Sequence, residues 1–392
     1  MPVICARSAR DNASDGESFV KVLMATPTYY PVTGGRETVV HRLATDLNEK
    51  GVCTDVITFN MDVSRRCIWR GQTEVSAEGF RIFKIPALDW SPLHSEKVTM
   101  GVNFIPGRFT DPRKKYDILH FHGPELSFPT FSCLARRPKI MHFHGLDLRF
   151  FKEYPINRFI LKHVANLYIS LTEQMKQELI SLGIPENQIR LLPNGIDTQV
   201  FHPSKNKEDN LILFVGRISP SKGLHILLES LDYLNQSVRL VVIGPQDWDS
   251  EYFNHIQLRI EKENKKGKHE ITYLGKKNQD EIVEWYQKAS IFVLTTIDYE
   301  ALGIVNLEAL ACETPVIATN VGGVSEAVRH GENGLIIQPN NAKKLADALQ
   351  YLLDNETVRK RLGEAGRKWV SNNFSNEVVV ERLLVIYKEL IT

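Results

Sequence analysis

The sequence predicts an α/β protein made of two domains, each built around a parallel sheet. Apolar, strand-like segments alternate with helical segments along most of the chain, and the length of 392 residues favours two or three domains. A polar stretch at residues 202–210 separates two such alternating series. Repeated strand–helix units are typical of parallel sheets that carry helices on both faces. We therefore predict two covered sheets joined by a linker.

The first series fills residues 19–203. It opens with an apolar strand at Val20–Thr26, and the apolar residues of Glu37–Lys50 then share one helical face, which Gly51 caps. The segment 86–114 is rich in Pro and Gly and has no clear period, so we interpret it as a mobile segment or one that shapes an acceptor site. Further strands are predicted at Val56–Phe59, Ile82–Ile85, Ile118–Phe121, Lys139–Phe143 and Leu167–Ser170.

The second series fills residues 204–376 and repeats the pattern. Its predicted strands are Leu211–Val215, Val238–Gly244, Ile271–Gly275, Ile291–Leu294 and Val316–Thr319, and its clearest helices are Leu224–Leu234, Asp280–Lys288 and Ala342–Asp354. We expect a last helix in residues 377–392 to pack back on the first domain. The polar residues 1–18 have no apolar signal core and are interpreted as a flexible leader.

Composition excludes several classes of protein. The first half carries 25 Lys and Arg against 21 Asp and Glu, the second 23 against 26, so the net charges of +4 and −3 are too small for a nucleic-acid-binding protein. No apolar run reaches the length of a membrane span. Five scattered cysteines without a Cys-x-x-Cys spacing argue for a reducing cytoplasm. These cysteines are Cys5, Cys53, Cys67, Cys133 and Cys312.

The segment from Asp298 to Glu308 carries two carboxylates between a strand and a helix. Glu300 follows the strand-like segment Ala289–Thr296, and Glu308 is expected about two turns inside the helical run Gly303–Cys312. The N–H groups and dipole of a helix start favour an anion, while carboxylates accept hydrogen bonds from hydroxyl groups. The segment thus suits a phosphorylated, polyhydroxylated ligand. Two solvated glutamates would be the simpler interpretation, but Glu308 interrupts an apolar run.

Two cations follow the predicted strand Leu211–Val215. They are Arg217 and Lys222, and Gly216 and Gly223 stand beside them. Cations at a strand end suit a diphosphate, although surface charge is the simpler alternative. We expect these cations to take the place of a metal ion. We predict no metal and no cofactor.

Several ordered motifs carry a family resemblance. Besides the paired glutamates, they are Ala25–Gly35, Pro193–Asp197, Phe214–Gly223 and Thr314–Gly323. Together they resemble the retaining glycosyltransferases of the glycogen-synthase-like, family 4 (group 1) type over roughly residues 20–390. The resemblance implies the GT-B fold, in which two Rossmann-like domains face each other across a cleft. One departure is Glu313, where the family often has Gly.

The resemblance also implies roles for single residues. It places His144 beside the transferred sugar, with His122 and His142 as nearby alternatives, and Asn194 near the nucleotide-sugar cleft, although an Asn-Gly turn would explain Asn194 alone. Similar enzymes are described by a front-face mechanism in which the leaving phosphate accepts the acceptor's proton. The remaining predicted substrate-binding residues are Gly34, Gly35, Ala301, Leu302, Gly303 and Glu308.

These observations predict a retaining, metal-independent glycosyltransferase that uses a nucleoside-diphosphate sugar and a hydroxyl acceptor. The alternatives are a nucleotide-sugar epimerase, a glycan phosphorylase, or a silent sugar-nucleotide-binding subunit. The acceptor is expected to be a sugar, a sugar phosphate or a lipid-linked molecule. Basic clusters at Arg113–Lys115 and Arg136–Lys139 would suit an anionic acceptor or a peripheral contact with the inner face of a membrane.

Overall fold

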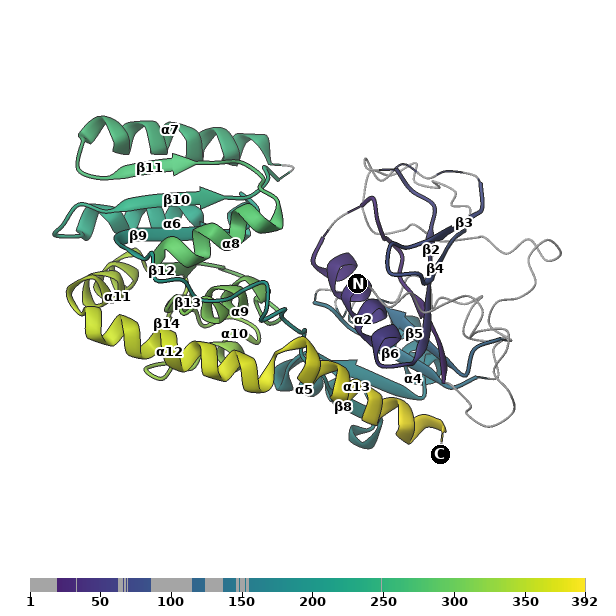
Figure 1. The fold of residues 1–392 in the computed structure, drawn as a ribbon. Helices are drawn as coiled ribbons and strands as arrows, with labels where there is room; N and C mark the ends of the chain where they lie inside the picture. The colour runs from purple at the N-terminus through teal and green to yellow at the C-terminus, as the bar shows by residue number, and fades with distance from the viewer. Residues whose placement is uncertain are drawn as a thin grey trace. The chain divides into compact units, whose positions relative to one another are not determined.

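The computed structural model describes residues 20–391 except residues 33, 63–65, 67, 69, 86–114, 124–136, 146–147, 149–151, 153–154 and 248. The predicted leader and the segment 86–114 therefore lie outside the described residues. The chain divides into two compact units (Figure 1). The first unit holds the residues up to Leu192 and again from Val380, and the second holds Pro193–Val379.

The first unit contains an eight-stranded sheet in the order β3-β4-β2-β1-β5-β6-β7-β8, and only β3 runs antiparallel to its neighbour. The buried strands β1, β2, β5, β6 and β7 are Lys21–Ala25, Cys53–Phe59, Ile118–His122, Lys139–His142 and Leu167–Ser170. The others are β3 (Gln72–Val75), β4 (Arg81–Ile85) and β8 (Ile189–Leu191). The apolar strands at the centre explain why both faces of the sheet need cover.

Helices α2 (Gly35–Glu49), α4 (Pro155–Val164) and α5 (Glu173–Ser181) belong to this unit. Helix α2 buries one apolar face, which includes Val40 and Leu47, and it packs on β2. The hydroxyl of Thr172 caps α5 by accepting from the Met175 N–H, as expected for a Thr at a helix start. The predicted strands of the first series are all present, and β3 and β8 at the two sheet edges are additional.

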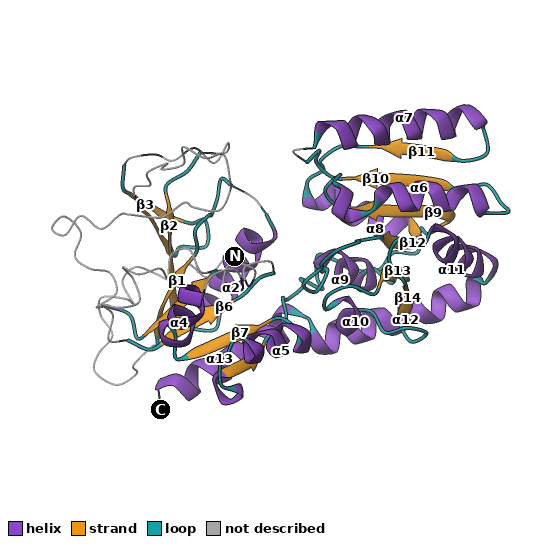
Figure 2. Ribbon diagram, turned by 180° about the vertical axis from the view of Figure 1, so that it is seen from behind, coloured by secondary structure: helices purple, strands orange, loops and turns teal. Residues whose placement is uncertain are grey.

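The second unit contains a fully parallel six-stranded sheet in the order β11-β10-β9-β12-β13-β14. Its strands are β9 (Glu208–Val215), β10 (Arg239–Ile243), β11 (Glu270–Tyr273), β12 (Ala289–Leu294), β13 (Val316–Thr319) and β14 (Gly334–Ile337). Its helices are α6 (Leu224–Ser230), α7 (Ser250–Lys266), α8 (Gln279–Lys288), α9 (Ile304–Ala311), α10 (Val324–Ala327), α11 (Ala342–Asp354) and α12 (Glu356–Asn373). Figure 2 shows these strands among their helices.

Alternate residues of the central strands enter two different cores. Leu213 of β9 packs with residues of α8, α9 and α12, whereas its neighbour Phe214 packs with residues of α6, α7 and α11. This alternation follows from the two-residue period of a strand. The second unit is thus a parallel sheet with helices on both faces, as predicted. Each predicted strand of this series is present, and β14 is additional.

The unit boundary lies before Pro193 rather than in the polar stretch 202–210. The Ile196 N–H donates to the Phe374 carbonyl at 2.7 Å, and the Arg367 guanidinium bonds the Thr198 and Phe201 carbonyls at 2.9 and 2.6 Å. Buried apolar and hydrogen-bonded backbone groups therefore attach residues 193–203 to the second unit.

The last helix, α13 (Asn376–Ile391), starts in the second unit and continues into the first from Val380. There Tyr387 is buried and its hydroxyl lies 2.7 Å from His120 Nδ1, while Glu389 pairs with Arg190 at 2.9 Å. Within the described ranges, no helix has both the length and the apolar character needed to cross a membrane.

Candidate active site

The turn after β9 is fixed by close backbone packing. Gly223 has a left-handed backbone (φ 67°), and a Cβ there would stand 2.1 Å from the Thr295 carbonyl oxygen, so only glycine fits. The Thr295 hydroxyl donates to the carbonyls of Lys222 and Gly223 at 3.1 and 2.9 Å. Lys222 ends a short 3₁₀ turn, Pro220–Lys222, and therefore stands at a defined place beside the end of β12.

The loop after β12 holds Glu300 in an equally restricted position. A Cβ on Gly322 (φ 54°) would lie 1.9 Å from the Glu300 carbonyl oxygen, and the Gly323 N–H donates to that same oxygen at 3.0 Å. Gly303, with φ 77°, then turns the chain into α9. Gly322 of the block Thr314–Gly323 is thus needed to let the chain pass close to Glu300.

These two turns bring Lys222 and Glu300 together. The Lys222 ammonium lies 2.5 Å from Glu300 Oε2, and the side chains are 19% and 17% exposed. The two residues are 78 positions apart in the sequence. They form one ion pair at the carboxyl ends of β9 and β12, the edge where ligands of open α/β sheets bind.

Arg217 has a different partner. Its side chain is 58% exposed and its guanidinium lies 3.4 Å from Asp247 Oδ2. The two predicted cations therefore contact different carboxylates, although both follow β9.

Glu308 lies on α9, in its second turn rather than about two turns deep, because the left-handed Gly303 delays the helix start to Ile304. The residue is half-buried. Burial raises the pKa of Glu308 to about 7, against the smaller, lowering effect of a hydrogen bond from the Tyr286 hydroxyl at 2.8 Å. Near neutral pH this carboxyl group is thus poised between its two protonation states.

Ala301 and Leu302 are buried, and Gly303 has no side chain, so only their backbone is available to a ligand. They precede the first N–H groups of α9, which have no acceptor within the helix and lie at its positive end. Asn306 follows in this helix, fully buried, and neither its Oδ1 nor its Nδ2 has a hydrogen-bond partner among the described residues.

The predicted glycines of the first unit stand at the start of α2. A Cβ on Gly34 would meet the Glu37 carboxylate at 2.5 Å, whereas a Cβ on Gly35 would meet nothing within 4 Å. Glu37 is buried and accepts a short hydrogen bond from Thr28. Because Gly34 has no Cβ, the Glu37 carboxylate can fold back against the start of its own helix. Gly35 has open space where a Cβ would stand.

The Asn-Gly turn after Pro193 belongs to the second unit. Asn194 is 5% exposed, and its Oδ1 has no hydrogen-bond partner in the described part of the chain. A Cβ on Gly195 would stand 2.6 Å from Asn376 Oδ1, so this glycine allows close contact with the start of α13.

His144 follows β6 in the first unit and belongs to a histidine cluster. Its Nε2 lies 2.9 Å from His122 Nδ1, and the rings of His120 and His142 stack beside them. The cluster arises because β5 and β6 pair in parallel with His122 opposite His142. Burial, assisted by neighbouring imidazoles, lowers the pKa of His122 well below its usual range.

The spacing of these histidines in the sequence does not indicate a metal site, but the fold brings three of them together. One ring nitrogen each of His120, His122 and His142 lie within 4.8 Å of one another. However, the rings of His120 and His142 are inclined by only 8°, and those of His120 and His122 by 30°. Lone pairs in nearly parallel ring planes do not converge on one point, so these rings would have to rotate to hold an ion.

Glu313, the one departure from the family pattern, has a left-handed backbone with φ 55°. Glycine adopts this conformation without strain, which explains the family's preference for it. The same turn is packed tightly, because a Cβ on Gly363 of α12 would lie 2.3 Å from the Glu313 carbonyl oxygen.

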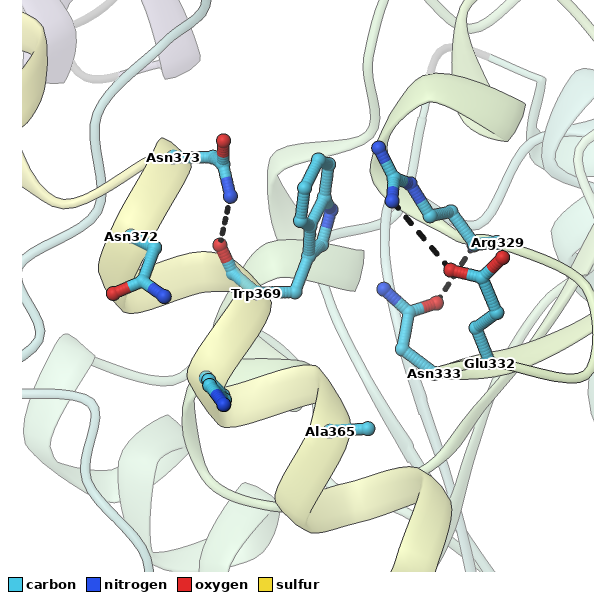
Figure 3. A pocket seen from close by; sticks show the side chains of 8 residues that line it. Arg329, Glu332, Asn333, Ala365, Trp369, Asn372 and Asn373 are labelled. Carbon is cyan, nitrogen blue, oxygen red and sulfur yellow. Dashed lines mark hydrogen bonds and ion pairs between the residues drawn. The ribbon is translucent and has the colours of Figure 1, made fainter.

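A hollow of about 310 Å³ lies between α12 and the turn after α10 (Figure 3). Arg329 stacks on the Trp369 ring there at 3.5 Å, and the Arg329 guanidinium lies 3.5 Å from Glu332. None of the predicted site residues lines this hollow.

Comparison with known proteins agrees with this arrangement. The family model of glycosyltransferase family 4 matches residues 33–200, and that of the group 1 glycosyl transferases matches residues 195–369. An uncharacterized glycosyltransferase of Methanocaldococcus jannaschii is 28% identical over 95% of this chain and 99% of its own. A D-inositol 3-phosphate glycosyltransferase of Pseudarthrobacter chlorophenolicus is 27% identical over 85% of each chain.

Solved structures show the same fold. Sucrose-phosphate synthase from Thermosynechococcus elongatus superposes with a TM-score of 0.76 at 21% identity, covering 95% of this chain and 99% of the other. HepE of Anabaena, in complex with UDP and glucose, gives 0.72 at 18%, covering 95% and 100%. The chain therefore belongs to the group 1 glycosyltransferases of the GT-B fold, and it is a glycosyltransferase.

Proposed function

We propose that this glycosyltransferase is a retaining, metal-independent enzyme that moves a sugar from a nucleoside-diphosphate sugar to a hydroxyl acceptor. The observation that carries the proposal is the ion pair of Lys222 and Glu300 beside the start of α9, with Glu308 one turn further. A cation, a helix start and two carboxylates match the parts of such a donor: diphosphate, sugar hydroxyls and ribose.

Donor binding would let Lys222 and Glu300 exchange each other for groups of the donor. Lys222 and Glu300 neutralise each other at 2.5 Å. A bound diphosphate supplies oxygens that compete for the ammonium, while a sugar hydroxyl donates to Glu300 in its place. A site of this kind keeps its charges compensated before and after binding, which limits the cost of desolvating them. HepE, a structural neighbour, has been solved with UDP and with UDP-glucose.

Departure of the diphosphate is the step that these residues would assist. Negative charge grows on the leaving phosphate, and Lys222, Arg217 and the positive end of α9 stabilise it without a metal ion or other cofactor. Glu300 orients the transferred sugar, and the family resemblance assigns His144 of the first unit to the same sugar. The leaving phosphate accepts the acceptor's proton, so both bonds change on one face of the sugar and its configuration is retained.

Basic surfaces of the first unit bear on the acceptor and on the location of the protein. The basic clusters lie outside the described residues except for Lys115 and Arg137–Lys139. A further basic surface is the exposed face of α4, formed by Arg158, Phe159, Lys162 and His163. An aromatic residue among cations favours contact with anionic headgroups. We propose a cytoplasmic enzyme whose acceptor is anionic or lipid-linked, met at the inner face of the membrane.

A donor and acceptor panel tests this function. The purified protein is incubated with UDP-, GDP- and ADP-sugars, with and without sugar, sugar-phosphate and lipid-linked acceptors, and the products are identified by mass spectrometry. The proposal predicts a glycosylated acceptor and a free nucleoside diphosphate. Epimerised donor without transfer, or a sugar 1-phosphate formed only with added phosphate, would contradict it.

A further inference from the structure

Tyr286, which no sequence motif singled out, contacts the carboxyl group of Glu308. It lies on α8 and is fully buried, and its hydroxyl donates to Glu308 Oε2 at 2.8 Å. This bond occupies one carboxylate oxygen and restricts rotation of the group. The second oxygen is left for donors from elsewhere, such as a pair of vicinal hydroxyl groups.

Tyr286 is itself held at its backbone and its ring. Its carbonyl oxygen accepts from Lys207 Nζ at 3.3 Å and from the Thr314 hydroxyl at 2.6 Å. Lys207 Nζ also donates to Thr314 Oγ1 at 2.5 Å and to the Cys312 carbonyl at 3.0 Å, at the C-terminal end of α9. The ring packs against Phe292 with centroids 5.5 Å apart. The phenol therefore has a fixed direction relative to the helix that carries Glu308.

We propose that Tyr286 is a positioning residue for donor binding: anchored through Lys207 and Thr314, it fixes Glu308 as the ionised acceptor of the ribose hydroxyls. The inference rests on the proposed function, because it assigns Glu308 to the nucleotide. It adds a residue that touches neither the sugar nor the diphosphate and acts only through Glu308.

The electrostatics of this region agree with that role. Burial raises the pKa of Glu308 to about 7, and the hydrogen bond from Tyr286 is what opposes the rise. The other titratable groups nearby are Cys312, whose pKa burial raises to about 12, and Lys207, whose pKa burial lowers to about 8. At neutral pH the thiol is uncharged and Lys207 keeps most of its charge, so Glu308 is the group of these three that titrates around pH 7, and Lys207 follows near pH 8.

The test compares wild type with Tyr286→Phe in steady-state kinetics from pH 6 to 8. Without the phenol hydrogen bond, the carboxyl group is harder to ionise and free to rotate, so donor KM at pH 7 should rise about tenfold or more. The turnover number at saturating donor should change less than threefold. The fall of donor KM with rising pH, centred near pH 7 in wild type, should move to higher pH in the variant.

Tyr116→Phe is the matched control, because that phenol is also buried and also donates to a carboxylate, Asp55 Oδ2 at 2.7 Å, in the first unit. It should leave donor KM and its pH dependence at wild-type values. A double variant tests the same role where Tyr286→Phe alone impairs folding. In the Glu308→Gln background, Tyr286→Phe should raise donor KM by less than a further twofold.

These outcomes distinguish failure of the positioning role of Tyr286 from failure of the proposed function. An unchanged donor KM and pH profile in Tyr286→Phe, with an active wild type, would overturn the positioning role and leave the proposed function standing. A full additional KM increase in the Glu308→Gln background would also overturn it. A wild-type protein that neither binds nor consumes any nucleotide sugar would overturn the proposed function, and this inference with it.

Discussion

Replacing Glu308 by Gln should change how the stability of the protein depends on pH. Burial raises the pKa of Glu308 from its ordinary 4.5 to about 7, so the folded protein binds a proton that the unfolded chain has already lost between these values. A raised pKa in the folded state gives stability that is complete below pH 4.5 and is lost as pH rises through 7. At about 1.4 kcal/mol for each pKa unit, the loss reaches about 3 kcal/mol by pH 8. The amide of the Glu308→Gln variant cannot ionise, so the variant escapes this loss.

The assay is urea unfolding of wild type and Glu308→Gln at pH 5, 6, 7 and 8. The difference between the two proteins is the informative quantity, because both keep the buried histidines of the first unit. Those histidines act in the opposite direction, since their lowered pKa values cost stability as pH falls. We expect the variant to gain about 2.5 kcal/mol relative to wild type from pH 5 to 8, because a small part of the loss has already occurred at pH 5. A difference that stays constant across this range would refute the reasoning about Glu308.

Four further predictions concern activity. Lys222→Met and Arg217→Ala should each slow transfer by about 10²–10³ without unfolding the protein, because each removes a cation that faces developing charge, and wild-type turnover by either variant would contradict this role. Glu300→Gln should mainly lower kcat, whereas Glu308→Gln should mainly raise donor KM, each by a factor of tens or more; the same pure KM effect in both would show that the division of roles is wrong. Transfer should survive excess EDTA, and activity that returned only with added metal would instead implicate an ion, for which the histidine cluster would be the first place to look. Finally, the protein should float with anionic liposomes at low salt and separate from them at high salt, while salt-independent or absent flotation would exclude the membrane contact.

Local sequence signals predicted the two parallel sheets and most of their strands. The bounds of β13 and α11 agree with the prediction because an unbroken apolar run and a clean helical period mark them. The short strand β3 escaped prediction, since its Gln, Thr and Glu residues are mostly exposed and only its antiparallel pairing with β4 makes it a strand. The same holds for β14, which begins with a glycine that only tertiary contact places in a sheet.

The contacts among the candidate site residues could not be predicted from the sequence. The motifs named Lys222, Glu300 and Glu308, yet the pairing of Lys222 with Glu300 depends on two glycine turns brought together by the sheet. Arg217 resembles Lys222 in sequence but finds its own carboxylate, because the two leave the turn after β9 at different points. Tyr286 carries no local signal, since an apolar face of an amphipathic helix looks the same whether or not its phenol meets a carboxylate.

The histidine cluster shows a further limit of sequence reasoning. Alternation along one strand places His142 and His144 on one side, but only the parallel register of β5 and β6 adds His120 and His122. Strand register between segments is set by the whole sheet, and no spacing within either segment records it.

Proton NMR of the reaction is the most direct test of transfer with retention from a nucleotide sugar. An α-linked UDP-, GDP- or ADP-sugar is supplied together with the acceptor identified in the panel, in the presence of EDTA, and the first-formed product is observed before it can equilibrate. We expect release of the nucleoside diphosphate together with a new α-glycosidic anomeric signal on the acceptor. A β-linked product, or no transfer from any donor that the protein binds, would contradict it.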